Sequence, residues 1–346
     1  MVLTKLIYGH ERRVVRKAGV TTGDAWRDRD LASRLPAIRS GDTDTAVMLL
    51  KTLDPNLRAL RVDVLGTECV PFLDRLEEAR KESDDPDLAL LAGRTRITAA
   101  WRVRTGAWAK DVSRERFERF HAMLPDAYEH LIHATNAAPD RPDALNHLQW
   151  FGLGVGMPRE DLDFLWERIV ERDPWHYESH LSRLQVLCQK WKGSHEEMFA
   201  FAREAAAHAH RGDPLLELVP RAHVERFSIL ERDREDEVVT VADLKSLRRE
   251  YFSDPGVRSE LADAADLWLS GDDDHPRGQE TAHEFGAALY FSGETELATR
   301  ALRLVGTIVP DLSAWTRCAS GAEYEYIRAR RKLGIPLSGQ ADPLRT

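Results

Sequence analysis

The chain has 346 residues, of which 42% are hydrophobic and 31% are charged. These fractions supply both a core and a polar surface, and they exclude a wholly disordered chain. A formal charge of −9 does not favour a nucleic-acid partner, and no stretch approaches the roughly 18 apolar residues of a membrane span. The length allows two or three compact domains or one elongated repeat array.

The N-terminus predicts neither a secretion signal nor an ordered element. Residues 1–8 hold only a short apolar stretch before the charges begin, whereas a signal peptide needs an apolar core of roughly 7–15 residues. We therefore expect a cytoplasmic protein with a flexible arm over residues 1–20. The arm's basic cluster could meet an acidic partner or could simply be solvated; it comprises Arg12, Arg13, Arg16 and Lys17.

Helical periodicity dominates the rest of the chain, and strand signals are scarce. Apolar residues recur at helical spacing, whereas the best alternating β-branched run, Val238–Val241, is only four residues long. We expect an all-α protein. Its predicted helices are 24–34, 42–53, 57–81, 86–106, 114–137, 142–154, 158–172, 175–190, 195–210, 214–231, 241–252, 255–270, 278–291, 294–308 and 322–333.

Many of these starts carry capping signals. Asp-Pro occurs at 54–55, 85–86, 173–174, 213–214 and 254–255. The aspartate can accept amide protons of the first turn, and proline suits the position after it because the missing N–H has no partner there. The run Ser194–Glu197 has the S-x-x-E pattern of a capping box.

A period of about 34 residues underlies the helices. Pro139 and Pro174 lie 35 residues apart, and Pro310 follows 136 residues later, which is four times 34. Such spacing is typical of tetratricopeptide repeats, and residues 285–293 match half of that consensus. We expect a tetratricopeptide-like α-solenoid of helical hairpins, with an N-terminal helical region at 21–110, repeats at 111–333 and a tail at 334–346.

One stretch resembles a known family. Residues 190–203 read K-W-K-G-S-H-E-E-M-F-A-F-A-R, and this resembles a bacterial family of unknown function marked by K-W-G-G-S-x-E-E-M-x-x-F-A-R. The resemblance is close over 173–226 and looser over 110–310, and Lys192 departs from the usual glycine. It implies a tetratricopeptide-like fold and supplies no activity or catalytic residue.

The signature also makes sense as a folding element. Trp191 would end one helix, and Gly193 would turn the chain with a positive φ. Ser194 would cap the next helix, whose Met198 and Phe201 would face the core. The alternative is that these residues shape a binding site.

Motifs for catalysis, metals or cofactors do not stand out. Nucleophile-elbow, P-loop and dinucleotide patterns are absent, and the glycines of 152–156 fit a turn between helices. The acidic run 272–274 fits a solvated turn better than a calcium loop. His176 and His180 stand one turn apart but lack an evident third ligand. The cysteines Cys69, Cys188 and Cys318 are odd in number and far apart, which predicts reduced thiols rather than disulfides.

Aromatic and basic residues of the central third are the candidate binding residues. First helices of solenoid repeats line a concave face, where tryptophan, tyrosine and arginine often dominate binding. We therefore expect a scaffold that binds a protein or peptide in a groove, without cofactor, metal or membrane. The rival interpretation is an all-α enzyme, or a small-molecule- or metal-binding protein, using the same His/Trp/Glu-rich region. The candidate residues are Trp150, Trp175, His176, Tyr177, His180 and Arg183.

Overall fold

The computed structural model describes residues 2–104, 112–272 and 274–337, with side chains from residue 10 onward. Its regular structure in these ranges is helical except for two three-residue strands, which confirms the all-α class. No helix within the described ranges combines the length and apolarity that crossing a membrane would require.

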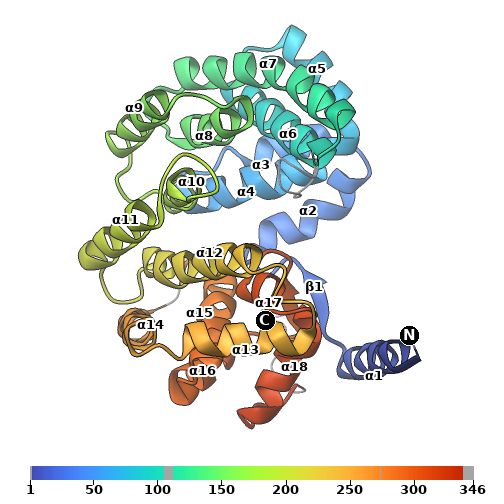
Figure 1. Ribbon diagram of the computed structural model, residues 1–346. Coiled ribbons are helices and arrows are strands. Elements are labelled where there is room, and N and C mark those ends of the chain that lie inside the picture. The colour runs from blue at the N-terminus through green and yellow to red at the C-terminus, as the bar shows by residue number, and fades with distance from the viewer. Residues whose placement is uncertain (1, 105–111, 273, 338–346) are drawn as a thin grey trace. The chain divides into compact units, whose positions relative to one another are not determined.

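The chain forms two compact units (Figure 1). The 28–193 unit is continuous, whereas the terminal unit combines residues 1–27 with residues 194–346. The division expected at 110/111 is not the one seen, because the helices on either side of it make the most extensive helix–helix contact of the molecule.

The 28–193 unit consists of helices joined by short connections. They are α2 (Arg29–Arg39), α3 (Thr43–Leu49), α4 (Pro55–Glu68), α5 (Leu73–Glu82), α6 (Pro86–Arg104), α7 (Arg114–Ala137), α8 (Asp143–Val155), α9 (Arg159–Val170) and α10 (Tyr177–Leu187). The helix expected over 57–81 is broken at a 3-10 turn, Val70–Phe72, because Pro71 cannot donate the backbone hydrogen bond that would continue it.

Helices α4, α6, α8 and α10 run in the same direction and pack on one another (Figure 1). Arg58 near the start of α4 bonds Asp143 at the start of α8. Near the other end, Arg102 of α6 donates to the carbonyl of Thr67 in α4, and Trp101 of α6 contacts Trp150 of α8. The N-terminal ends of these helices therefore lie together, and so do their C-terminal ends. Helix α10 also contacts α4.

The terminal unit contains the remaining elements. They are α1 (Val2–Ala18), β1 (Thr21–Gly23), α11 (His195–His208), the 3-10 helix η3 (Pro214–Glu217), α12 (Leu218–Asp233), α13 (Val241–Phe252), α14 (Pro255–Trp268), α15 (Gly278–Ser292), α16 (Thr295–Leu302), β2 (Ile308–Pro310), α17 (Ala314–Cys318) and α18 (Ala322–Lys332). Val241 begins α13, so the residues with the best strand pattern form no strand.

Both ends of the chain contain more order than the sequence indicated. Residues 2–18 form α1, whose Val14, Val15 and Ala18 pack on the terminal unit's core. Strand β1 pairs in parallel with β2, with Thr21 opposite Ile308. Of the expected tail 334–346, Ile335 is buried, and residues 338–346 lie outside the described residues.

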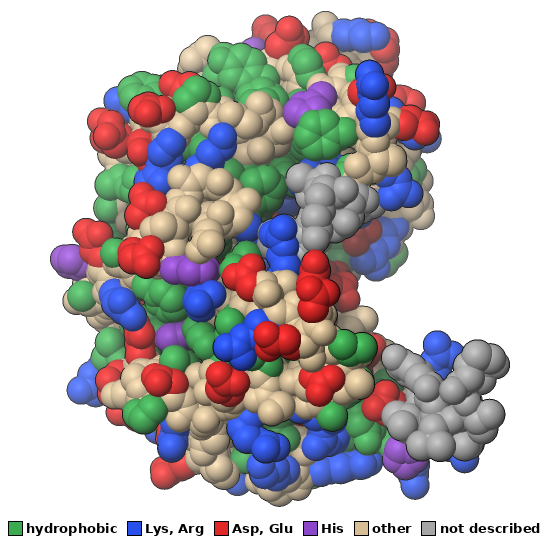
Figure 2. Space-filling view, viewed as in Figure 1, with side chains coloured by type: hydrophobic (Ala, Val, Ile, Leu, Met, Phe, Trp, Pro, Cys, Tyr) green, Lys and Arg blue, Asp and Glu red, His purple; other side chains and the backbone are tan. Residues whose placement is uncertain are grey.

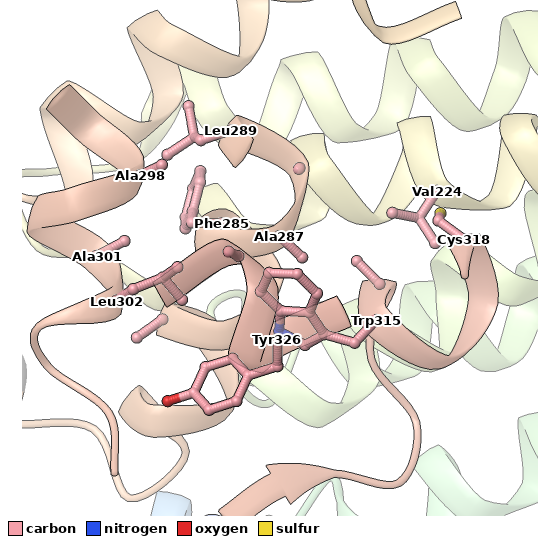
Figure 3. Packing of buried hydrophobic residues seen from close by; sticks show 14 of the residues in the cluster. Val224, Phe285, Ala287, Leu289, Ala298, Ala301, Leu302, Trp315, Cys318 and Tyr326 are labelled. Atoms are coloured by element: carbon pink, nitrogen blue, oxygen red, sulfur yellow. The ribbon is translucent and has the colours of Figure 1, made fainter. Parts of the chain in front are cut away.

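Aromatic side chains fill the core of the terminal unit (Figure 3). Phe285 of α15 stacks on Trp268 of α14 with ring centroids 5.0 Å apart, and Trp315 of α17 meets Tyr326 of α18 at 5.6 Å. A Cβ at Gly286 would lie 2.3 Å from a Leu302 methyl carbon. Glycine at this position is therefore what lets α15 and α16 pack closely.

Polar contacts recur between residues about 34 positions apart in both units. Lys51 pairs with Asp85 at a separation of 34 and Arg300 with Asp266 at 34. Arg258 pairs with Glu294 at a separation of 36. These three contacts each join segments at or near different helices of the same unit.

Candidate functional site

The six candidate residues do not form one surface. Trp175 is 52% exposed and lies in a turn, because α10 begins only at Tyr177. Trp150 is half-buried, and the other four candidates are buried. The six residues therefore do not together line an exposed surface, since four of them are buried where the helices pack.

His180 and Arg183 join α10 to α9. The His180 ring meets Trp166 edge-on at 5.0 Å, and the Arg183 guanidinium lies 2.5 Å from an Asp163 carboxylate oxygen. Burial alone would raise the pKa of Asp163, but hydrogen bonds from Arg159 and Arg183 outweigh it and hold that pKa below its usual value. These contacts give both residues a packing role, and Tyr177, 2% exposed, belongs to the core.

His176 belongs to a second group, which we call the polar end. It gathers side chains from the starts of α4, α6 and α8, from the connection before α8 and from the N-cap of α10. Its members are Arg58, Asp87, Arg141, Asp143 and His176. All five lie within the 28–193 unit, at the ends where these helices begin.

Asp143 is the centre of the polar end. It is 2% exposed, and its Oδ2 accepts a bond of 3.0 Å from Arg58 Nε. Its Oδ1 lies 3.9 Å from His176 Nε2, too far for a hydrogen bond. Neither Oδ1 nor that Nε2 has another hydrogen-bond partner among the described residues.

A buried polar atom without a partner calls for an explanation, and an ordered water or ion is one of them. His176 Nδ1 already bonds Ser179 Oγ at 2.7 Å, so its Nε2 is the nitrogen that remains. Burial lowers the pKa of His176 despite the nearby Asp143, and the ring is therefore neutral at pH 7.

A small pocket lies beside Asp143. Asp87, Arg141 and Asp143 form its polar wall, and alanines and a leucine form its apolar wall. Arg141 donates to Asp87 over 2.6 Å. Burial raises the pKa of Asp87, and the Arg141 charge opposes this rise.

His176 and His180, the two histidines one turn apart, are linked through the backbone. His180 Nδ1 lies 3.0 Å from the His176 carbonyl oxygen, so that nitrogen is the donor. Within the described ranges no group of three or more His, Cys, Asp or Glu side chains could hold a metal ion.

Further along α8 and α10, polar side chains bond the two helices together. Ser182 Oγ accepts from Gln149 Nε2 at 2.9 Å and donates to Asn146 Oδ1 over 2.5 Å. Burial lowers the pKa of His147 to about 3. This stripe fixes the register of the helices but is closed to solvent.

Aromatic residues mark the opposite end of the unit, which we call the aromatic end. It comprises Trp101, Arg104, Trp150 and Trp191. Trp101 meets Trp150 and Trp191 edge-on, at 6.4 and 5.7 Å. The Arg104 guanidinium lies 5.1 Å from the Trp101 ring and 5.6 Å from the Trp191 ring.

The aromatic end combines partial exposure with unused bonding capacity. Its three tryptophans are half-buried, and the buried Trp101 Nε1–H has no acceptor among the described residues. Of its members, the expected binding set included only Trp150. The family-like signature contains Trp191 and so could have indicated it. No sequence pattern indicates that Trp101 and Arg104 lie next to Trp191.

The family-like signature crosses the boundary between the two units. Residues 190–193 close the 28–193 unit, and Ser194 caps α11 by accepting from the Glu197 amide at 3.2 Å. Met198 is 1% exposed, as expected of a core residue, and Phe201 is half-buried.

Gly193 is needed for a different reason from the one expected. Its φ is not in the left-handed region, but a Cβ there would lie 2.2 Å from the Leu187 carbonyl oxygen. Close approach of backbone, not a positive φ, therefore requires glycine. Lys192, where the family has glycine, donates its Nζ to the Gly156 carbonyl.

Two other expected turns are accounted for. Gly156, with φ +71°, ends α8 in the left-handed conformation, which is the role of an inter-helix glycine. Of the acidic run 272–274, Asp272 and Asp274 are exposed, and Asp273 lies outside the described residues.

The last signature residue, Arg203, begins a polar relay in the terminal unit. Its guanidinium donates two hydrogen bonds to the Glu260 carboxylate, a bidentate pair with distances of 2.7 and 3.0 Å. Glu260 lies 3.3 Å from His223 Nε2, and His223 Nδ1 lies 2.9 Å from the Tyr251 hydroxyl. Although burial acts to raise it, the hydrogen bonds from His223 and Arg203 lower the pKa of Glu260 to about 2.

No family model matches the chain, and comparison with curated proteins finds no match either. Figure 2 shows acidic and basic side chains interspersed on the viewed face. With no match and no single charge dominating this face, the polar end and the aromatic end of the 28–193 unit are the features that point to a function.

Proposed function

We propose that the protein is a cytoplasmic helical-repeat scaffold that binds a protein or peptide at the aromatic end. The hairpins and their contacts about 34 residues apart support a tetratricopeptide-like array. Its three free, buried cysteines support a reducing compartment.

The observation that carries this proposal is the arrangement of tryptophans around Arg104. Tryptophan and arginine are the residues that most often dominate binding energy, and here three half-buried tryptophans lie near Arg104, whose own side chain is buried at 8% exposure. The Trp101 N–H would donate to an acceptor on the partner, and the Arg104 charge favours an acidic one. We infer an acidic peptide segment that also carries an apolar side chain to lie against Trp150 and Trp191.

The test is a selection of peptides from a random library against the whole protein, followed by affinity measurement. We expect acidic peptides with an aromatic or large aliphatic residue, and about a tenfold loss of affinity with Arg104→Lys. Lysine keeps the charge but loses the planar stacking on two rings.

The matched control is Trp175→Ala, which removes an exposed tryptophan of the same unit away from this end. Its affinity should equal that of the unsubstituted protein. Peptides without acidic residues, or equal losses in both variants, would place binding elsewhere and refute the assignment.

The rival function, small-molecule binding by the central histidine-rich region, has its own support at the polar end. There Asp143 and His176 each retain an atom without a hydrogen-bond partner among the described residues, and Asp143 lines a small pocket. This feature is independent of the aromatic end, and neither site requires the other.

A further inference from the structure

We propose that a basic surface formed by α1 and α18 is a docking site for a short peptide segment rich in Asp or Glu. This surface, which we call the basic patch, lies in the terminal unit, so it does not depend on the function proposed for the aromatic end. Its members are Arg12, Arg13, Arg16, Lys17, Arg331 and Lys332.

Packing of α1 against α18 brings the two parts of the patch together. Val14, Val15 and Ala18 of α1 and Leu333 just after α18 pack against the same hydrophobic core, and the two helices are in direct contact. Although acidic and basic side chains mix over most of the face in Figure 2, Lys and Arg gather along its lower edge, where Figure 1 places these helices. Basic residues from opposite ends of the chain therefore meet on one part of the terminal unit.

The basic side chains of α1 occupy one side of that helix. At about 100° per residue, the four of them span an arc of about 140°, and the core-facing Val14, Val15 and Ala18 lie outside this arc. The carboxylate of Glu11 also lies outside it, at a half-buried position. The exposed side of α1 between residues 12 and 17 is therefore wholly basic.

The charge of the patch is not neutralised by neighbouring carboxylates. All six side chains are exposed, and none has an acidic partner among the described residues; the Lys332 ammonium lies over the Tyr290 ring, 5.5 Å from its centroid. Other exposed arginines of this unit are paired, as Arg203 is with Glu260 and Arg258 with Glu294. The patch therefore differs from the ordinary charged surface around it.

Helix dipoles account for only part of this charge. Four of the six members lie in the last turns of α1 and α18, where a cation offsets the partial negative charge of the helix end. Each end carries the equivalent of about half a charge, which is less than the two full charges placed on it. Arg12 and Arg13 lie before the last turn, so the dipole gives no reason for them.

The dimensions and the surroundings of the patch favour a short peptide. Arg12 and Arg16 lie one turn apart, about 6 Å along the helix axis, close to the spacing of about 6.6 Å between alternate side chains of an extended peptide. Arginine also pairs with carboxylates through two parallel hydrogen bonds. The whole protein carries a net charge of −9, so an anionic partner reaching well beyond the patch, such as a nucleic acid or a bilayer, would meet repulsion.

The experiment measures binding of hexaglutamate to the whole protein by isothermal titration calorimetry. We expect binding that weakens between about 50 mM and about 200 mM sodium chloride, because salt screens exposed charges. Hexaserine, which has no charged side chain, should not bind. Hexaglutamate has no apolar side chain, so its binding does not test the aromatic end. Failure of hexaglutamate to bind at the lower salt concentration would overturn the proposal.

Two double variants separate the patch from the net charge. Arg12→Gln with Arg13→Gln should weaken binding about tenfold and leave the unfolding midpoint unchanged, because both side chains are exposed. Arg116→Gln with Arg119→Gln, the control, removes two exposed arginines of the 28–193 unit and changes the net charge equally. Its affinity should stay the same, and an equal loss in both variants would contradict a local site.

Two other anions test the class of partner. Hexathymidylate and vesicles containing phosphatidylserine should bind more weakly than hexaglutamate. If either bound more tightly, and lost that binding in the variant with Arg12→Gln and Arg13→Gln, the partner would be a nucleic acid or a membrane surface and the peptide assignment would be wrong.

Discussion

Among single residues, the buried ion pair of Arg58 and Asp143 shows how pairing offsets burial. The two are 7% and 2% exposed and lie 85 positions apart in the chain. Removing one partner of such a pair leaves a buried charge without compensation. The same chemistry at the surface, as in Arg34 with Asp30, is screened by water.

We therefore expect Arg58→Ala to lower the free energy of unfolding by about 3–5 kcal/mol. The matched control, Arg34→Ala, should cost about 0–1 kcal/mol. Denaturant unfolding of both variants measures the difference. Similar losses in the two would mean that burial does not set the strength of the Arg58 pair.

A prediction about glycine follows from backbone distances. Gly193→Ala would bring a Cβ within 2.2 Å of a carbonyl oxygen, so it should destabilise by more than about 2 kcal/mol. Gly306→Ala is the control, because no atom lies within 4 Å of its added Cβ and its φ is not positive. It should be nearly neutral. Thermal unfolding compares them, and an equally mild Gly193→Ala would refute the crowding argument.

The pH dependence of stability should reflect Glu284 of the terminal unit. Burial raises the pKa of Glu284, although Arg221 and Arg317 oppose the rise. A carboxyl group whose pKa is higher in the folded state stabilises the fold when protonated, so stability falls as the pH rises above about 4.5. Glu284→Gln cannot ionise and should show a smaller fall between about pH 5 and pH 8.

Glu260 should act in the opposite direction and serves as the comparison. Its folded pKa is lowered to about 2, so its contribution is present above its ordinary pKa and is lost as the pH falls toward 2. Glu260→Gln should therefore change only the acid side of the stability profile. If both variants altered the same pH range, the assignment of these two carboxyl groups would be wrong.

Among elements, the helix bounds that followed most closely from the sequence belong to two helices with a local cap. The predicted 114–137 and 241–252 match α7 and α13, whose N-caps Ser113 and Thr240 bond amides three residues ahead. Asp173-Pro174 looked the same but only forms a turn, and α10 starts at Tyr177. Strand β1 is stabilised by pairing with residues 287 positions away, which no local pattern can reveal.

The cap of α11 yields a prediction at this scale. Ser194→Ala removes the acceptor for the Glu197 amide and should cost about 1 kcal/mol. Ser194→Asp keeps an acceptor beside the helix N-terminus and should retain the stability. Urea unfolding distinguishes them. Equal stability of the alanine variant and the parent would show that this cap contributes nothing.

At the scale of the whole molecule, the candidate sites were the least predictable part. The sequence placed His176, His180 and Arg183 on one helix but could not show that α4, α6, α8 and α10 bury their facing sides together. Nor could it show that Trp101 and Trp191, 90 positions apart, would meet. Residue types indicated which region of the chain could contain a binding site. Tertiary packing determines which side-chain atoms in that region remain without a partner.

The division into two units predicts that residues 28–193 fold when expressed alone. This segment is continuous and contains its own helix contacts and buried ion pairs. Circular dichroism should show a helical spectrum and denaturant should give a cooperative transition. A fragment that is unfolded or unfolds gradually would show that the 28–193 unit depends on the rest of the chain.

The parallel pairing of β1 with β2 has a consequence for synthesis. Thr21 leaves the ribosome almost 290 residues before its partner Ile308. Translation proceeds at roughly 5–20 residues per second, so β1 is made many seconds before β2, the strand with which it pairs. During that time synthesis of residues 28–193 is completed, so this unit can fold before residues 194–346 of the terminal unit are made. A chaperone that binds nascent chains should therefore hold residues 14–23 longest, and moving this segment to the C-terminus should shorten that exposure.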